Sequence, residues 1–287
     1  MRIFVLLPLL IVLSACSKPE PVVEVNPVEE KQEVKEKVQP EEPVAETKPA
    51  EAVSVSLNLK YETEVDAVTI TGCDRKASGA LSIPATIEGK PVTSIGGLAF
   101  GLCSGLTSIT IPDSVTSIGV QAFTGCSSLM SITIPDSVTS IRVLFNKPFS
   151  YCAGLTDIQV GEGNLNYTDV NGILFNKEKT VLIAHPAGKT EINYTVPDRV
   201  TSISMSAFSG CRNLTSITIG DGVTSIGDGA FDGCSSLSFV TFLGDAPKTG
   251  GIMHFREATS TIYRKPEAKG WSDNWCGRPV KLISEKP

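Results

Sequence analysis

The chain has 287 residues with 25 Lys and Arg against 31 Asp and Glu, a formal net charge of -6, and 41% hydrophobic residues. This apolar content is enough for a sizeable core in one large domain or two smaller ones. The acidic balance argues against nucleic-acid binding, which needs a basic footprint. The 2 His residues leave little for catalytic or zinc chemistry, whereas 8 Cys in an exported chain suggest disulfides.

Residues 1–15 are predicted to be an export signal. Arg2 gives a positive start, and the apolar stretch Ile3–Leu13 is too short to span a bilayer but fits a signal peptide. Leu13-Ser14-Ala15-Cys16 resembles the lipobox of a bacterial lipoprotein. The resemblance implies a covalent lipid on Cys16 and, with Ser17 next, an outer-membrane location. Ordinary secretion with cleavage after Ala15 is the alternative.

Residues 17–52 are predicted to be a disordered stalk. They hold 10 Glu, 5 Lys and 6 Pro but no Gly, Phe, Tyr or Trp, so they cannot bury enough apolar surface to offset the entropy of ordering. Proline and charge repulsion favour an extended chain that holds the rest away from a membrane. A binding motif within the stalk is the alternative. An N-terminal capping segment is expected over 53–91.

A 23-residue repeat fills most of 92–245. The units Val92–Ser114, Val115–Ser137, Val200–Gly222 and Val223–Asp245 match almost letter for letter, Val138–Gly163 has three extra residues, and 164–199 is an irregular insert. One unit cannot bury its apolar face, but stacked units can, with strands about 4.8 Å apart. The sequence therefore predicts a solenoid.

Each unit contains the pattern of a short strand, a turn and a second short strand. Leu106, Ile109 and Ile111 alternate with polar residues, which predicts a half-buried strand. Pro112-Asp113 then turns the chain, and a short helical turn is expected near Phe123. One internal ladder of Phe100, Phe123, Phe149, Phe208 and Phe231 and another of Cys103, Cys126, Cys152, Cys211 and Cys234 are expected.

These units resemble the BspA-type leucine-rich repeat, V-x-x-I-G-x-x-A-F-x-x-C-x-x-L-x-x-I-x-I-P, over about Thr69–Ile283. The resemblance implies a leucine-rich-repeat solenoid with a parallel β-sheet, short second strands and helical turns. Tyr167–Gly188 is similar to the insert between repeat blocks, with a β-hairpin expected over Ile173–Ala184. Thr261–Pro279 resembles the C-terminal closing strand of such proteins, and a C-terminal cap is expected over 246–287. The family is known mainly as bacterial surface proteins that bind host proteins or other cells.

The ladder cysteines are expected to be mostly free, buried thiols that pack as small apolar groups. Their spacing also lies within the range for disulfides, so cross-linking is the alternative. Cys73 and Cys276 lie near opposite ends of the array and are not expected to reach each other.

The outward positions of the main sheet form the candidate binding face, for a protein or a glycan. Its residues are mostly hydroxyl-bearing and uncharged: Ser108, Thr110, Ser131, Thr133, Asp157, Gln159, Asn193, Thr195, Ser216, Thr218, Phe239 and Thr241. Their simpler role is to keep a β-surface soluble. An ice-binding lattice is the weakest alternative, because Asp157, Gln159 and Phe239 interrupt it.

A second row is acidic and shares the turn after the strand: Asp113, Asp136, Glu162, Asp198 and Asp221. Stacked carboxylates repel one another, so they are weak candidates for calcium binding. The commoner explanation is that Asp suits the turn.

No catalytic constellation is predicted. His185 and His254 lie in no ligand motif and in no coil that carries a ladder cysteine, so a Cys–His nucleophile is not expected. Trp271 and Trp275 are expected to cap the core and, alternatively, to form a sugar platform.

The sequence thus predicts a non-enzymatic envelope lipoprotein with no cofactor besides the lipid at Cys16. Its predicted role is adhesion or protein binding at the bacterial surface, through a host or other-cell protein. A periplasmic structural or assembly lipoprotein and a glycan-binding module are the alternatives.

Overall fold

The computed structural model describes residues 59–142, 148–249 and 255–287, all within one compact unit, Pro49–Pro287. In this part of the chain the regular structure is β-strand apart from the 3-10 helix η1 (Ile283–Glu285). The solenoid expected from the repeats is confirmed. The expected helical turns are single hydrogen-bonded turns, in which, for example, Cys126 N donates to Phe123 O at 3.2 Å.

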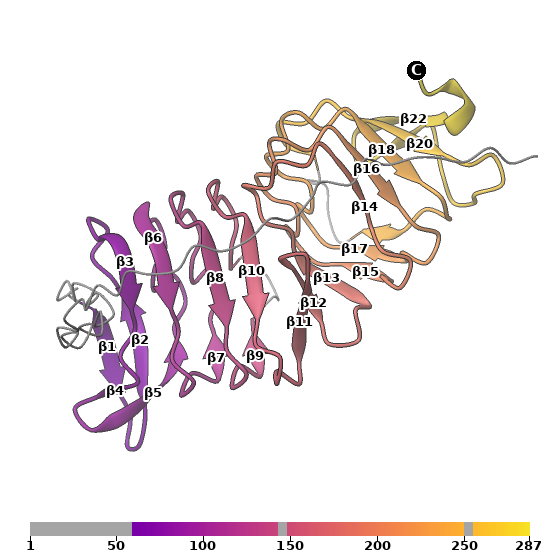
Figure 1. Ribbon diagram of the computed structural model, residues 1–287. Coiled ribbons are helices and arrows are strands. Elements are labelled where there is room, and N and C mark those ends of the chain that lie inside the picture. Colours follow the sequence, from indigo (N-terminus) through magenta and orange to yellow (C-terminus); the bar gives the residue numbers. More distant parts are fainter. Residues whose placement is uncertain (1–58, 143–147, 250–254) are drawn as a thin grey trace, which may run out of the picture. The chain divides into compact units, whose positions relative to one another are not determined.

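The main strands of successive coils form two parallel sheets (Figure 1). The first is ordered β10 (Asp157–Val160), β8 (Ser131–Ile134), β6 (Gly105–Thr110) and β3 (Ser78–Ser82). The second is ordered β14 (Asn193–Thr195), β16 (Ser216–Ile219), β18 (Phe239–Phe242), β20 (Thr261–Arg264), β22 (Arg278–Leu282) and an antiparallel β21 (Asn274–Trp275). Equivalent repeat positions pair in register, so each repeat position becomes a row across the strands.

The short second strands also form two sheets. The first joins β1 (Lys60–Thr63), β2 (Val68–Gly72), β5 (Lys90–Ile95), β7 (Ser117–Ile118) and β9 (Ser140–Ile141), with β4 (Thr86–Ile87) on β5. The second joins β11 (Tyr167–Val170), β12 (Ile173–Asn176), β13 (Val181–Ala184), β15 (Ser202–Ile203), β17 (Ser225–Ile226) and β19 (Lys248–Thr249).

The insert divides the solenoid into two blocks. Strands β12 and β13 form the expected antiparallel hairpin. Leu174 is buried in the apolar core of the first block, whereas its neighbours Ile173 and Phe175 are buried in the core of the second. Because successive side chains of a strand point to opposite faces, the hairpin lies between the two cores and is apolar on both sides.

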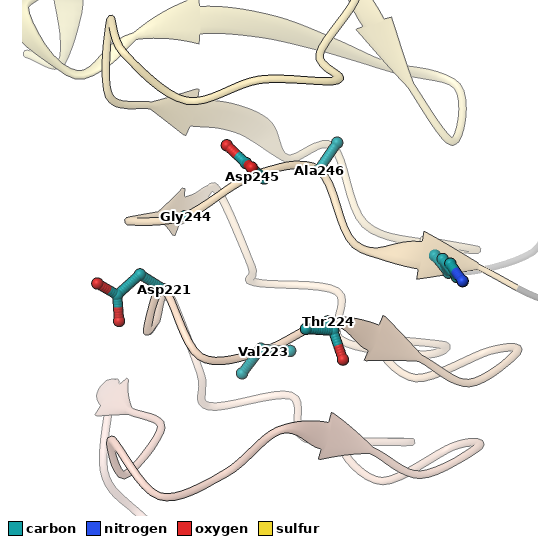
Figure 2. A pocket seen from close by; sticks show the side chains of 7 residues that line it. Asp221, Val223, Thr224, Gly244, Asp245 and Ala246 are labelled. Atoms are coloured by element: carbon teal, nitrogen blue, oxygen red, sulfur yellow. The ribbon is translucent and has the colours of Figure 1, made fainter.

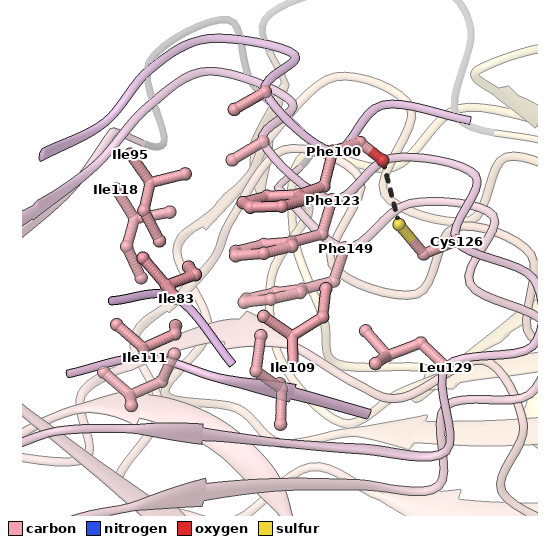
Figure 3. Packing of buried hydrophobic residues seen from close by; sticks show 14 of the residues in the cluster. Ile83, Ile95, Phe100, Ile109, Ile111, Ile118, Phe123, Cys126, Leu129 and Phe149 are labelled. Atoms are coloured by element: carbon pink, nitrogen blue, oxygen red, sulfur yellow. Dashed lines mark hydrogen bonds between the residues drawn. The ribbon is translucent and has the colours of Figure 1, made fainter. Parts of the chain in front are cut away.

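The single phenylalanine ladder expected from the sequence is therefore two ladders. In the first block Phe123 stacks on Phe100 at 5.5 Å and on Phe149 at 5.6 Å between ring centroids (Figure 3). In the second, Phe231 stacks on Phe208 at 5.5 Å and on Phe255 at 5.2 Å. The prediction of one continuous ladder is wrong because the hairpin separates the two cores.

A polar contact links the two blocks on the side of the hydrogen-bonded turns. Tyr151, in the first block, donates its hydroxyl to Asp232 Oδ2 at 2.8 Å. Arg256 Nε and Nη2 donate to the two oxygens of the same carboxylate at 2.9 and 3.1 Å. Gly233, which follows Asp232, has φ +75°, a backbone conformation that favours glycine at this turn.

Candidate recognition surface

The outward row of the main sheets is accessible over much of its length. Six of the candidate residues are exposed: Thr110, Ser131, Thr133, Gln159, Asn193 and Thr195. Ser108, Asp157, Ser216, Thr218 and Phe239 are half-buried. Neighbouring side chains hydrogen-bond across strands, as where Ser216 Oγ donates to Asn193 Oδ1 at 2.6 Å. The surface is thus polar, nearly uncharged and ordered by its own cross-strand contacts.

The one charged residue of this face is engaged by the protein itself. Asp157 Oδ2 accepts a hydrogen bond from Gln159 Nε2 at 2.7 Å. Its Oδ1 lies where a Cβ on Gly172 would stand, only 2.0 Å from that position, and Gly172 has φ +73°. The carboxylate therefore packs on the turn of the insert, and only glycine leaves space for it.

The C-terminal end of the face is covered by the chain itself. Thr241 is only 3% exposed, and Tyr263 beside it is also 3% exposed. Lys286 Nζ donates to Thr241 Oγ1 at 3.3 Å and lies 5.6 Å from the centre of the Phe239 ring. Thr241 is therefore not accessible, and the sequence could not show this because the covering residues lie outside the repeat.

The acidic row lies on exposed turns, as its role in turn formation requires. Asp113, Asp136, Glu162, Asp198 and Asp221 are all exposed. The Asp136 carboxylate lies against the next coil, where a Cβ on Gly161 would be 2.0 Å from Oδ1. Within 59–142, 148–249 and 255–287, no three His, Cys, Asp or Glu side chains converge into a potential metal site.

A groove of about 430 Å³ opens between two neighbouring coils of the second block (Figure 2). Ala246 stands in the row that Val223 occupies one coil earlier, and both residues line the groove. Asp221, Asp245 and Lys248 are the charged residues that line the groove. Asp245 Oδ1 accepts a hydrogen bond from Lys269 N at 2.6 Å, so this carboxylate has a structural role.

A second hydroxyl-rich surface, which the sequence did not indicate as a candidate, lies at the starts of the short second strands. Its exposed threonines are Thr116, Thr139, Thr201 and Thr224. Each donates its hydroxyl to a backbone carbonyl of the preceding coil at 3.2 to 3.4 Å. The recurring Val-Thr-Ser-Ile could have indicated this row, since its threonine lies between two buried positions.

His185 is not isolated, as the sequence suggested, but contacts a ladder cysteine. Its Nδ1 lies 3.5 Å from Cys211 Sγ, and its Nε2 lies 2.6 Å from Glu191 Oε1. Its ring stacks on Phe208 at 5.1 Å, in the place of a ladder phenylalanine. The sequence placed His185 in no coil that carries a ladder cysteine; the contact forms between neighbouring coils, at the 26-residue separation that also joins Cys126 to Phe100 and Cys234 to Phe208.

This Cys–His–Glu arrangement does not have the chemistry of a nucleophile. Cys211 is 3% exposed and His185 is 5% exposed, so a substrate cannot reach the sulfur. Contact with Cys234 and burial raise the pKa of the Cys211 thiol well above its ordinary value. Burial lowers the pKa of His185. The thiol is therefore protonated at neutral pH, whereas a cysteine nucleophile acts as the thiolate.

The other ladder cysteines are also thiols, as predicted. Cys126 Sγ donates to Phe100 O at 3.1 Å (Figure 3), and Cys152 Sγ donates to Phe123 O at 3.0 Å. Burial raises the pKa of each to about 12. The seven cysteines of the described chain are free, and the one other, Cys16, lies outside the described residues, as does His254.

Both tryptophans pack on the second core, as expected of a cap. Trp271 lies 4.8 Å and Trp275 5.2 Å from the Phe242 ring centroid. Trp271 Nε1 donates to Gly244 O at 3.2 Å. These contacts close the end of the core with aromatic surface.

These features define a leucine-rich-repeat solenoid: its parallel strands are stacked, its leucine and isoleucine rows are buried, and its outward face is nearly uncharged. The model of the BspA type leucine rich repeat region matches 6 copies over residues 81–195 and 188–261, and the chain belongs to this family. Its members are generally cell-surface proteins, and such solenoids are typically non-catalytic binding modules. No curated protein matches the chain.

Three solved structures are similar to this chain. A leucine-rich repeat protein from Eubacterium ventriosum is 24% identical, with a TM-score of 0.43 over 70% of this chain and 75% of that one. The Treponema pallidum (T. pallidum) leucine rich repeat protein is 25% identical, with a TM-score of 0.43 over 71% and 83%. The pneumococcal vaccine antigen PcpA is 17% identical, with a TM-score of 0.47 over 72% and 80%. In the described residues, no helix has the length and apolar character needed to cross a bilayer.

Proposed function

We propose that this protein is a lipid-anchored recognition protein of the bacterial outer-membrane surface, which binds a protein partner through the outward face of its main sheets. The observation that carries the proposal is that this face is accessible and nearly uncharged. Thr110, Thr133 and Thr195 are exposed, while the single carboxylate of the face, Asp157, packs on the insert. Membership of a family of surface binding modules supports the same role.

The buried cysteines and the histidine support a binding role over catalysis. Protonated thiols that donate to backbone carbonyls hold adjacent coils together, and this is a structural role. The aromatic side chains that a sugar would stack on are engaged within the protein, because Phe239 lies under Lys286 and Trp271 packs on Phe242. These contacts favour a protein partner over a glycan.

The anchor is proposed from the signal alone. A lipid on Cys16 and an extended stalk over 17–52 would hold the solenoid at a distance from the membrane. Radiolabelled palmitate should be incorporated into the full chain and not into Cys16→Ser. Protease added to intact cells should remove the solenoid; if the solenoid is cut only after the outer membrane is opened, the periplasmic alternative replaces surface recognition.

The binding face is tested with matched arginine substitutions. Thr110→Arg with Thr133→Arg adds charge and bulk to the main sheet, and Thr116→Arg with Thr139→Arg makes the same change on the second-strand sheets. Cells displaying each full-length variant are compared for adhesion to immobilised extracellular-matrix proteins. We expect the first pair to reduce adhesion at least tenfold and the second pair to leave it unchanged. Equal losses, or no loss from the first pair, would overturn the assignment of the face.

A further inference from the structure

Cys73 and the first ladder cysteine, Cys103, lie at the N-terminal end of the solenoid and contact the same backbone oxygen. Cys126, Cys152 and Cys234 each donate to the carbonyl oxygen of a ladder phenylalanine at 3.0 to 3.1 Å. Cys103 begins the ladder and makes no such short contact; its Sγ lies 3.9 Å from Asp74 O. Cys73 Sγ lies 3.6 Å from the same oxygen. The two thiols therefore lie against one acceptor, and neither has a short hydrogen bond to it.

This pair also has a route to solvent. Cys73 is half-buried, unlike the buried thiols of the ladder, and it borders a cavity of about 500 Å³ together with Lys60, Asp74 and Arg75. Lys60 and Arg75 place two positive charges at the cavity against the one negative charge of Asp74. An anionic reagent would thus be attracted to the one accessible member of the pair.

We propose that Cys73 and Cys103 are a dithiol site that is converted to a disulfide by exchange with a small anionic disulfide of the glutathione type. The Cys73 thiolate attacks one sulfur of the reagent, forms a mixed disulfide and releases one glutathione thiolate. The Cys103 thiolate then attacks the Cys73 sulfur and releases the second. Two protein thiols lose two protons and two electrons, and the reagent is reduced to two thiols.

The raised pKa of Cys73 limits the rate of this exchange. Burial, and then the neighbouring Cys103, raise the pKa of Cys73 to about 12. Because the thiolate is the nucleophile, the exchange is slow at neutral pH and accelerates about tenfold per pH unit. The site is therefore a structural cross-link that forms slowly, in contrast to a rapid redox sensor.

The cross-link would join the N-terminal cap to the first repeat. Cys73 follows β2, and Cys103 precedes β6 of the first full unit. Closing a loop of about 30 residues restricts the unfolded chain, and for a domain of this size the melting temperature should rise by roughly 5–15 °C.

The experiment uses the full chain with Cys16→Ser, so that the thiol outside the solenoid does not react. The folded protein is incubated with glutathione disulfide at mildly alkaline pH, then mapped by mass spectrometry and melted. We expect a Cys73–Cys103 disulfide and a higher melting temperature. Cys73→Ser and Cys103→Ser should each abolish both changes, whereas Cys276→Ser, which removes the other half-buried cysteine, should abolish neither.

A charge test uses a second reagent. Replacing Lys60 and Arg75 with glutamine should slow exchange with glutathione disulfide at least threefold and leave exchange with uncharged hydroxyethyl disulfide unchanged. The proposal is overturned if Cys73 remains a thiol or ends as a stable mixed disulfide. Equal slowing with both reagents would overturn the role of the two cations.

Discussion

Replacing His185 with phenylalanine should make the protein less sensitive to acid. His185 occupies a rung of the second aromatic ladder, 5.1 Å from the Phe208 ring, and is 5% exposed. Phenylalanine fits the same row, as Phe208 and Phe231 show one and two coils later. The substitution removes a titrating group from the core and keeps the aromatic stack.

The direction of this stability change follows from the pKa of His185. Burial lowers that pKa from its ordinary value of 6.5, even though Glu191 opposes the shift. As the pH falls through 6.5, the unfolded chain binds a proton that the folded chain does not bind. Stability is therefore lost on acidification, by at most about 1.4 kcal/mol per pH unit for one proton. One unit below 6.5, the loss is therefore at most about 1.4 kcal/mol, which corresponds to no more than roughly 5 °C in melting temperature.

The assay is thermal unfolding of the wild type and His185→Phe across pH 5.5 to 7.5 (about two units, spanning the histidine transition). The groups facing the ring are Glu191, Tyr194, Lys189 and Cys211, and both proteins retain them. The variant should gain stability relative to the wild type as the pH falls, and Glu191→Gln should enlarge the wild-type loss. If the wild type instead gains relative to the variant, the Glu191 pair outweighs burial and the reasoning is refuted.

Three further substitutions test the packing of the blocks by denaturant unfolding. Phe123→Ala should lower the free energy of unfolding by about 3–5 kcal/mol. The loss should exceed that of Phe149→Ala, because Phe123 stacks on two rings and is fully buried whereas Phe149 is 6% exposed. Equal losses would contradict the stabilising role of the ladder. Gly172→Ala should lower the free energy of unfolding more than Gly79→Ala does. Both glycines have a positive φ, but only Gly172 lies against a carboxylate. Tyr151→Phe removes the hydroxyl that donates to the Asp232 carboxylate, and should lower the free energy of unfolding by about 1 kcal/mol. An unchanged denaturation midpoint would show that this contact does not stabilise the blocks.

The repeat made most of the fold predictable. Alternation around Ile109 and the recurrence of Phe123 and Cys126 specify the buried rows, because stacked coils place identical positions together. The structure departs from this expectation where the repeat is interrupted. The hairpin at Ile173–Ala184 was expected, but its position between two cores was not, since periodicity does not show which side of an insert faces which block.

The His185 contact was missed because the insert carries a histidine where the regular units carry a phenylalanine. His185 lies 23 residues before Phe208, and Cys211 meets it across a 26-residue separation, as Cys126 meets Phe100. Aligning Ala184-His185 with Ala207-Phe208 would have placed the histidine in the aromatic row and exposed the contact. The cover over Thr241 had no such signal, because Lys286 lies after the last strand and outside any repeat.

The division into two blocks also limits what the recognition face can bind. Strands β10 and β14 are not paired, so the face consists of two separate arrays. Each array of about four strands, with about four residues per strand at a rise of 3.3 Å, of which every second side chain points outward, spans roughly 15 Å by 13 Å. A standard protein interface covers about 800 Å² on each partner, which is several times this area. Even the two arrays together supply only about half of that area, so a stable partner must contact both arrays and the turns that flank them. Arginine at Thr133 alone and at Thr195 alone should each abolish tight binding, and tolerance of either substitution would confine the partner to one block.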